Sequence, residues 1–486
     1  MINAKELTIK LMKVGLSLIL VLTNIMCSKN NQVADTMPVK VVKAGQLDYW
    51  LTKGDQSILF EKQKPLDFFT GSINNYPTIE IDTVSTFQSV DGFGYTLTGG
   101  SAGLINKMGT FQKNSLLNDL FLCNNNSLCI TYLRISLGAS DLDDAVFSYN
   151  DIDVNSEDTA LSAFSLSRDT MALIPVLKEI LKINPSIKIM ASPWSAPLWM
   201  KSNKNSVGGT LLPKYYDVYA RYFVKYIQEM KKNGIVIDAV TVQNEPEHGG
   251  NNPSMVMKAT EQNEFVKKHL GPAFKKANLN TKIVIWDHNC DNPQYPISIL
   301  NDSETKPYVD GSAFHLYAGN ISAMSTVHNA HPDKSLYFTE QWTGSNGTFS
   351  GDLLWHTKNV VIGSLRHWGK VVLEWNLAND PAYRPHTPGG CTQCKGALTI
   401  AGNVTTKNVS YYIIAHASAF IPPGSKRIAS NEISNIHSVT LLTPDNQKVL
   451  IAVNESKQAE IFNISFYGKK ALASIPAEST VTFVWK

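Results

Sequence analysis

Short apolar segments recur through the middle of the chain, and each one is followed by glycine, proline or polar residues. Eight of them lie at 87–97, 130–137, 187–193, 238–244, 282–289, 309–317, 336–342 and 370–378. Sequences with the three- and four-residue apolar spacing of helices lie between them. Near-continuous apolar strands that alternate with helices predict a parallel sheet covered on both faces. Repeated eight times, this unit predicts an α/β fold of the (β/α)8 TIM-barrel type.

The two ends of the chain have a different pattern. After a predicted last helix at 409–421, short strands with alternating apolar residues predict an antiparallel β domain at 421–486. Residues 38–85 carry little helix signal and are predicted to add strands to that domain. We therefore expect a barrel at 86–420 and a side antiparallel β-sandwich formed from both termini.

The first 27 residues predict export. Lysines at 5, 10 and 13 precede an apolar stretch at 14–26, which is too short for a stable membrane span and is followed by Cys27. A cysteine in this place resembles the lipidation site of a bacterial lipoprotein signal. The segment 1–27 therefore predicts a periplasmic or outer-membrane, cell-surface lipoprotein with a lipid anchor at Cys27.

Composition adds little to this picture beyond two exclusions. The chain is 43% hydrophobic and 17% charged, and a net charge of +3 gives no basis for a nucleic-acid partner. Glycine-rich phosphate loops in strand–helix context are absent from the sequence, so we expect no cofactor.

The cysteines are interpreted as disulfides, in keeping with export. Cys123 and Cys129 flank a polar loop, Cys391 and Cys394 form a CxxC motif, and Cys290 is left without a partner. A zinc site would need a second ligand pair, and the sequence has neither a second CxxC nor an HExxH motif. We therefore predict that the protein holds no metal.

Two glutamates stand where the chemistry of a barrel enzyme is expected. Glu245 follows the fourth predicted strand and Glu340 lies in the seventh. In an eight-strand ring these strands lie on opposite sides, so both carboxyl groups can face one ligand across the mouth. Hydrolysis of a glycosidic bond needs such a pair, one a proton donor and the other a nucleophile or base.

Other carboxylates near strand ends compete with this pair. Glu374 lies inside the eighth strand beside Trp375, and we interpret it as a member of a structural ion pair. Asp141, Asp143 and Asp144 form a loop cluster, most of which we expect to be solvated.

Several motifs together resemble glycoside hydrolase family 30, the family of glucosylceramidases and microbial β-1,6-glucanases. In chain order they are QSVDGFGYTLTGGSA, YLRISLGASDLDD, MASPWSAPLWMKSN, VTVQNEPE, AFHLYAG, YFTEQW, EWNLANDP and IPPGSKRI. The resemblance covers most of the chain. It implies a barrel with a side β-sandwich, as the hydrophobic pattern predicts, and a retaining mechanism.

The resemblance also implies roles for single residues. Glu245 would be the acid/base and Glu340 the nucleophile, which Arg134 would hold ionised. Asn244 would bind the sugar 2-hydroxyl, and Asp141 and Trp194 the far hydroxyls of a terminal glucose. Tyr317 would hydrogen-bond to the nucleophile, and Trp375 would form the floor under the sugar.

The expected substrate is a β-glucan oligo- or polysaccharide, most simply a β-1,6-glucan. Glucosylceramidase or xylanase-type activity of the same family is the alternative, and Arg384, in the loop after the eighth strand, is the residue that a xylanase interpretation would use. A different class remains open too, a carbohydrate-binding surface lipoprotein without turnover. Such a protein would normally lose one carboxylate, whereas this sequence keeps both.

Overall fold

The computed structural model describes residues 41–71, 74–124 and 127–486 of the chain. The predicted signal segment 1–27 and its anchor Cys27 lie outside the described residues. Within the described ranges, no helix is both long and apolar enough to cross a membrane.

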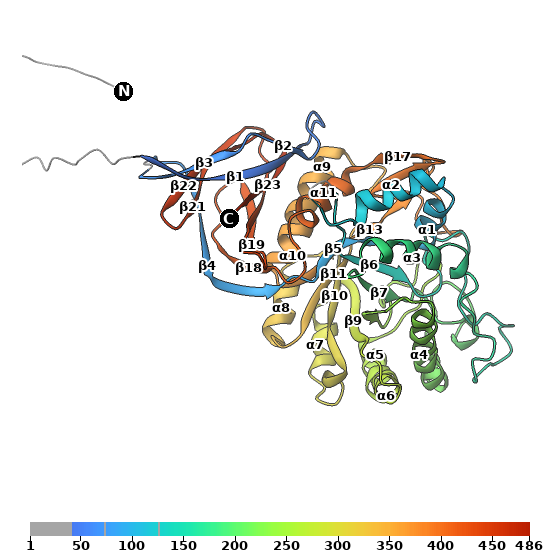
Figure 1. Cartoon of the computed structure of the whole chain (residues 1–486). Helices are drawn as coiled ribbons and strands as arrows, with labels where there is room; N and C mark the ends of the chain where they lie inside the picture. Colours follow the sequence, from blue (N-terminus) through green and yellow to red (C-terminus); the bar gives the residue numbers. More distant parts are fainter. Residues whose placement is uncertain (1–40, 72–73, 125–126) are drawn as a thin grey trace, which may run out of the picture. The chain divides into compact units, whose positions relative to one another are not determined.

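A closed barrel of parallel strands forms the centre of the described chain (Figure 1). Its strands are β5 (Gly92–Thr96), β6 (Tyr132–Ser136), β7 (Lys188–Ser192), β8 (Ala239–Thr241), β9 (Lys282–Cys290), β10 (Val309–Gly319), β11 (Ser335–Glu340) and β13 (Gly369–Asn376). Each pairs with its neighbours in chain order, and β13 pairs with β5 to close the ring. The barrel prediction is confirmed, with one strand for each predicted segment.

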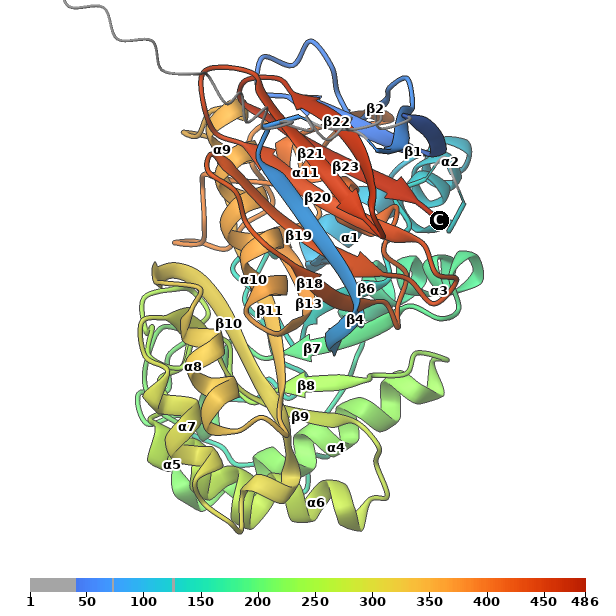
Figure 2. The ribbon, with the colours of Figure 1, turned by 90° about the vertical axis from the view of Figure 1, so that its left-hand side faces the viewer.

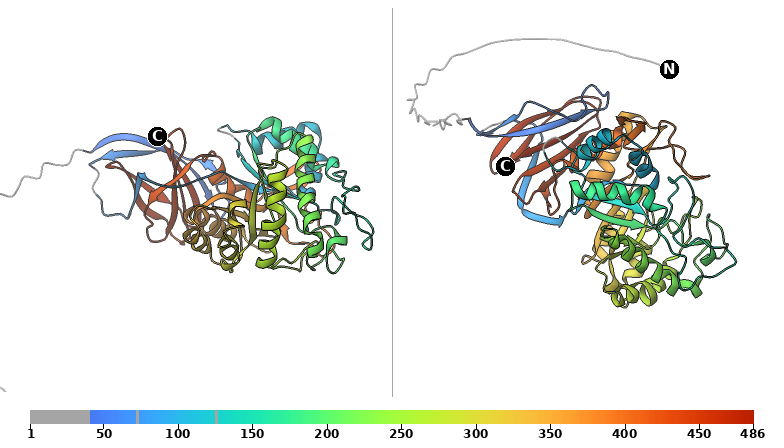
Figure 3. Two further views of the ribbon diagram at one scale, coloured as in Figure 1. Left: turned by 90° about the horizontal axis from the view of Figure 1, so that it is seen from below. Right: turned by 45° about the vertical axis from the view of Figure 1, so that its right-hand side comes forward.

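Helices lie along the outside of the barrel (Figure 3). They are α1 (Gly99–Asn106), α2 (Thr110–Phe121), α3 (Leu173–Ile183), α4 (Tyr216–Lys232), α5 (Ala259–Phe265), α6 (Gly271–Lys276), α7 (Gln294–Leu300), α8 (Ala323–Ala330), α9 (Phe349–His356), α10 (Gly363–Arg366) and α11 (Val409–Ser418). Short π-helical segments, Val266–Leu270 and Thr357–Ile362, join α5 to α6 and α9 to α10. The apolar faces of these helices and the outward residues of the strands make one large core.

The segments after β11 and β13 contain short strands that the hydrophobic pattern did not indicate. Strand β12 (Thr343–Gly344) pairs with β15 (Cys394–Lys395), and β14 (Ala378–Asn379) begins a small sheet with β16 (Leu398–Ala401) and β17 (Val404–Lys407). The β12–β15 pair ties the ends of two barrel strands together beside the mouth.

Both termini build the sandwich. Its strands are β1 (Val42–Lys53), β2 (Glu61–Lys62), β3 (Leu66–Thr70), β4 (Thr78–Ser89), β18 (Lys426–Ser430), β19 (Ile436–Leu442), β20 (Lys448–Asn454), β21 (Glu460–Phe466), β22 (Lys469–Ile475) and β23 (Ser479–Trp485). Figure 2 shows β4 running beside the C-terminal strands. The pairing is antiparallel except between β4 and β21, which are parallel. A second apolar core fills the space between the layers.

A buried histidine joins the last helix of the barrel to the sandwich. His416 of α11 is fully buried, and its two ring nitrogens lie 2.8 Å from Thr52 Oγ1 and 2.9 Å from Thr482 Oγ1. Burial lowers the pKa of His416 to about 3, so the ring is neutral and has one donor and one acceptor nitrogen. Each hydroxyl can complement one of them, which makes this junction fully hydrogen-bonded.

We expect His416→Ala to lower the free energy of unfolding by about 1–3 kcal/mol, because Thr52 and Thr482 would stay buried without their partner. The folded state disfavours the charged imidazole, so the contribution of His416 decreases as the pH falls below the pKa of the unfolded state, about 6.5. Urea unfolding should therefore give a gap between wild type and variant that narrows from about pH 7 to about pH 5. His437→Ala, a partly exposed histidine of the same sandwich, is the control; an H416A curve that overlays the wild type at neutral pH would contradict this account.

Candidate active site

The backbone turns sharply where Glu245 follows β8. Although the predicted strand extends to Asn244, regular pairing stops at Thr241. Beyond it, the Asn244 N–H donates to Pro193 O at 2.8 Å, just after β7, and the Glu245 N–H donates to Asp287 O of β9 at 3.0 Å. Glu245 has a φ of 46°, a left-handed conformation that costs roughly 1–3 kcal/mol for a residue with a side chain. These hydrogen bonds hold the turn and aim the carboxyl group into the barrel mouth.

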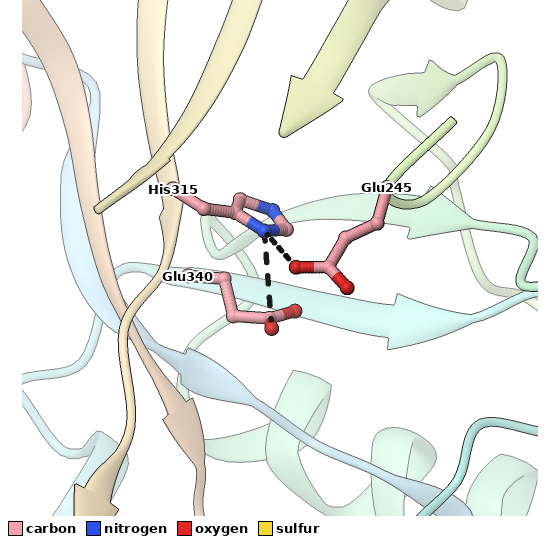
Figure 4. A group of neighbouring side chains, drawn as sticks. All are labelled: Glu245, His315 and Glu340. Carbon is pink, nitrogen blue, oxygen red and sulfur yellow. Dashed lines mark hydrogen bonds and ion pairs between the residues drawn. The ribbon is translucent and has the colours of Figure 1, made fainter. Parts of the chain in front are cut away.

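Glu245 and Glu340 face one another across the mouth. Figure 4 shows both carboxyl groups turned toward the ring of His315. His315 Nδ1 lies 3.2 Å from Glu245 Oε1 and 3.9 Å from Glu340 Oε1, and an oxygen of each carboxyl group lies within 4.8 Å of the other. Retaining glycosidases have carboxyl groups about 5–5.5 Å apart and inverting ones about 6.5–9.5 Å. The pair has the close spacing of the retaining geometry.

Bulges near the ends of three strands set which side chains enter the mouth. Along β9 and β10, Ala313 pairs with Trp286 and Phe314 with His288, so Asp287 is an extra residue. Register shifts of the same kind occur before Glu340 in β11 and around Trp375 in β13. A bulge bends its strand and re-aims a side chain. It breaks the two-residue alternation that places side chains in a regular strand.

Arg134 of β6 lies at the centre of the site and is fully buried. Its Nη1 donates to Glu340 Oε2 at 2.5 Å, and its Nη2 donates to Asn244 Oδ1 at 2.6 Å and to Asp287 Oδ2 at 2.9 Å. Its Nε donates to Ser192 Oγ at 3.1 Å. The planar guanidinium thus fixes side chains from four other strands or strand ends at once.

Asp287 and His315 complete the site, and the sequence analysis gave them no role. Asp287 Oδ1 lies 3.1 Å from His315 Nε2 and accepts a hydrogen bond from Thr339 Oγ1 at 2.7 Å. His315 therefore bridges two carboxylates, Asp287 on one nitrogen and Glu245 on the other. The only sequence signal for them is that polar residues stand at the ends of apolar strands.

The charges of this cluster control its protons. Burial lowers the pKa of His315, but the neighbouring carboxylates Glu340, Asp287 and Glu245 outweigh burial and raise it to about 9. Burial raises the pKa of Glu245, yet the hydrogen bond and charge of His315 bring it below its usual value. For Glu340, burial and repulsion from Glu245 and Asp287 prevail over His315 and Arg134, and its pKa is raised. Because the two glutamates repel each other, their protons come off in two separate steps, and the two pKa values belong to the pair and not to either residue.

One wall of the mouth is apolar and closed by a disulfide. The rings of Trp194 and Trp375 lie 5.4 Å apart, and buried Cys394 packs with them. Cys391 and Cys394 are disulfide-bonded, and the Cys391 N–H donates to Asp141 Oδ2 at 3.2 Å. Burial, with repulsion from Glu340, raises the pKa of Asp141 to about 7. This wall borders a cavity of about 290 Å³ that both glutamates also line.

The structure places the remaining predicted residues as follows. Tyr317 donates from its hydroxyl to Glu340 Oε1 at 2.9 Å. Glu374 does not line the cavity; it lies 2.8 Å from His356 Nδ1, as a structural pair. Cys123 and Cys129 form a second disulfide, and Cys290 is free and buried.

The expectation that the aspartates at 141–144 are mostly solvated is wrong. Asp141 is only 5% exposed and Asp143 only 3%, while Asp144 is exposed. Asp143 is buried because it accepts hydrogen bonds from the N–H and the hydroxyl of Ser140, which replace its water.

Comparison with known proteins gives consistent matches over this fold. The glycosyl hydrolase family 30 TIM-barrel domain model matches residues 90–421, and the family's β-sandwich domain model matches 424–483. The chain is 32% identical over 425 residues to endo-1,6-beta-D-glucanase neg1 of Aspergillus fumigatus, with 82% of this chain and 85% of that one covered. It is 28% identical over 425 residues to the lysosomal acid glucosylceramidase of Mus musculus, with 82% of each chain covered.

Solved structures agree with these sequence matches. The endo-beta1,6-glucanase BT3312 superposes with a TM-score of 0.84 at 32% identity, covering 91% of this chain and 99% of that one. SrfJ from Salmonella typhimurium has the same fold, with a TM-score of 0.85 at 24% identity and the same coverage.

We expect the double variant Cys391→Ser/Cys394→Ser to lower kcat/KM for an aryl β-glucoside by about 10–100-fold, mainly through KM. Without the cross-link, the loop that donates to Asp141 and packs on Trp194 and Trp375 is no longer fixed. Cys123→Ser/Cys129→Ser removes a disulfide of similar size that does not line the cavity and serves as the matched control. Steady-state kinetics would contradict the role of this wall if both double variants kept the wild-type KM.

Proposed function

The chain belongs to glycosyl hydrolase family 30 and is a glycoside hydrolase, and we propose that it cleaves β-1,6-glucan chains with Glu340 as nucleophile and Glu245 as acid/base. The observation that carries these two roles is the asymmetry of the donors around the pair. Glu340 accepts from the Arg134 guanidinium and the Tyr317 hydroxyl, which favour its charged form. Glu245 contacts neither Arg134 nor Tyr317; among the described residues, its carboxyl group has His315 and Asn251 as hydrogen-bond partners.

The reaction then takes two steps. Glu340 attacks the anomeric carbon while Glu245 protonates the leaving oxygen, which breaks the glycosidic bond and forms a glycosyl ester on Glu340. A water molecule next attacks the same carbon, Glu245 takes its proton, and the ester bond to Glu340 breaks. The sugar leaves with its original anomeric configuration, and both carboxyl groups return to their starting states.

The raised pKa of Glu340 is compatible with these roles. Repulsion from a charged Glu245 is one of its causes. When Glu245 carries the proton, that repulsion is absent, and Arg134 and His315 favour a charged Glu340. The proposed reaction starts from the state with one proton on Glu245 and none on Glu340, although His315 lowers the pKa of Glu245.

The other contacts of the sugar are proposed from the same cluster. Asn244 Oδ1 is occupied by Arg134, and its amide NH2, which has no partner among the described residues, would donate to the 2-hydroxyl. Asp141 and Trp194 would hold the far hydroxyls, with Trp375 as the floor.

The choice of β-1,6-glucan as substrate follows the relatives, of which several at 30–32% identity are named endo-1,6-beta-D-glucanases. The position of Arg384 argues against xylanase activity, because its side chain is 65% exposed and does not line the cavity. Digestion of pustulan, laminarin, gentiobiose and glucosylceramide side by side tests the choice. Pustulan should release oligosaccharides fastest, and preference for glucosylceramide would contradict it.

We also propose that the protein acts outside the cytoplasm, anchored through Cys27 in the outer membrane. The basic and apolar segment before Cys27 supports export. Disulfides at Cys123–Cys129 and Cys391–Cys394 support an oxidising compartment.

We expect Glu340→Gln to lower kcat/KM by at least about 10⁴-fold on every substrate, because no ester can form. Glu245→Gln should lower it by ~10²–10⁴-fold on gentio-oligosaccharides but little on a dinitrophenyl β-glucoside, whose leaving group needs no proton. Asp144→Asn, an exposed carboxylate on the loop of Asp141, is the control and should retain full activity. Equal losses of E245Q on both substrates would exclude the acid/base role.

The acidic limb of the pH profile should move in the same variant. A charged Glu245 raises the pKa of Glu340, so its replacement by glutamine lowers that pKa. The kcat/KM of E245Q for the dinitrophenyl glucoside should persist to a lower pH than that of the wild type. If the acidic limb of the profile is the same in E245Q and the wild type, the charge of Glu245 does not raise the pKa of Glu340.

A further inference from the structure

The cavity has a second, polar wall beside Glu245, and its other residues have no role in the proposed mechanism. His248, Asn251, His288 and Asn289 line it together with Glu245. The His248 N–H donates to Glu245 O at 2.8 Å, and His288 lines the same cavity as the Glu245 side chain. The aromatic and disulfide wall of Trp194, Trp375 and Cys394 forms a separate buried cluster.

His288 carries the strongest signal in this wall. The residue is only 7% exposed, and its Nδ1 is buried with no hydrogen-bond partner among the described residues. The ring is tilted against that of Trp286, with centroids 5.0 Å apart, and stands nearly perpendicular to that of His315, with centroids 6.4 Å apart. Burial lowers the pKa of His288 to about 4, so at neutral pH the ring has one donor and one acceptor nitrogen. A buried polar atom without a partner calls for an explanation, and His288 differs from the core residues in the same state because it lines the cavity.

The neighbours of His288 are open to a ligand in the same way. Asn289 uses its Oδ1 to accept from the Tyr317 N–H at 3.0 Å, and its amide NH2 has no partner in the described chain. His248 is exposed, and its ring makes no hydrogen bond to a described residue. Asn251 Nδ2 lies 3.5 Å from Glu245 Oε2, so this amide stands beside the oxygen that would meet the leaving group.

We propose that His248, Asn251, His288 and Asn289 form the binding site for the sugar on the leaving-group side of the scissile bond. The inference rests on the proposed roles of Glu245 and Glu340, because the acid/base stands beside the leaving oxygen. Imidazole and amide groups match the hydroxyls of a sugar, and they do not match the alkyl chains of a lipid. The leaving group is therefore a carbohydrate.

The same wall would bind an acceptor sugar in the reverse direction. A sugar hydroxyl can attack the anomeric carbon of the glycosyl ester: its oxygen forms the new glycosidic bond, the ester bond to Glu340 breaks, and Glu245 takes the proton. An occupied site thus speeds turnover of the ester, and this rate measures binding there independently of any substrate linkage.

The test uses the full-length exported protein inactivated with a dinitrophenyl 2-deoxy-2-fluoro-β-glucoside. After removal of excess reagent, the return of activity is followed in buffer alone, with gentiobiose, and with 1-propanol at the same concentration. Gentiobiose should speed reactivation of the wild type by about 10-fold or more over buffer, and propanol only slightly. If gentiobiose is no better than propanol, the wall does not bind a sugar and the inference is wrong.

Variants tie the effect to these residues. His288→Ala should abolish about 90% or more of the gentiobiose acceleration, measured as the ratio of the reactivation rates with gentiobiose and in buffer for the same variant. His288→Asn, which keeps a donor and an acceptor, should retain part of this acceleration. His248→Ala changes an exposed ring and should weaken the acceleration without affecting folding. His437→Ala, on the sandwich, is the control. Full acceleration in both H288A and H248A would overturn the inference.

Failure of this inference differs from failure of the proposed function. If the fluoroglucoside does not inactivate the enzyme, the proposed catalytic roles are wrong. If inactivation occurs and gentiobiose accelerates reactivation, but pustulan is not cleaved, the result supports the leaving-group site and contradicts the choice of β-1,6-glucan as substrate.

Discussion

The buried guanidinium of Arg134 is the interaction on which the rest of the site depends. Removal of its charge from water costs several kcal/mol, which Asp287 and Glu340 offset by direct hydrogen bonds. Asn244 and Ser192 use the remaining directions of the same plane. The proposed nucleophile, the residue before the proposed acid/base and the carboxylate behind His315 are therefore positioned by one side chain.

The barrel makes this arrangement possible by bringing strand ends together and by interrupting their regularity. Bulges around Asp287 and before Glu340, and the left-handed backbone at Glu245, turn successive side chains into one mouth. In the resulting cluster, the imidazole of His315 lies between the carboxyl groups of Glu245 and Asp287, so the charge of each group affects the pKa of the others. Its two walls then divide the cavity by chemistry: indole and disulfide on one side, imidazole and amide on the other.

Much of this was predictable from the sequence, and the rest depends on long-range packing. Apolar strands followed by polar residues predicted the barrel and the positions of Glu245 and Glu340, because parallel strands bring their ends together. The link between Asp287 and His315 was not predictable, since a bulge alters the alternation that the sequence pattern assumes. The burial of Asp143 likewise depends on Ser140, a local hydrogen bond that composition does not indicate.

The most direct test of the central claim is identification of the residue that carries the glycosyl ester. The fluoroglucoside-labelled enzyme would be digested at low pH and its peptides sequenced by mass spectrometry. The account predicts a single label on Glu340 of the wild type. It predicts no label in Arg134→Met, because the Glu340 carboxylate of that variant is no longer held ionised and oriented. A label on Glu245 or Asp287, or undiminished labelling in R134M, would contradict it.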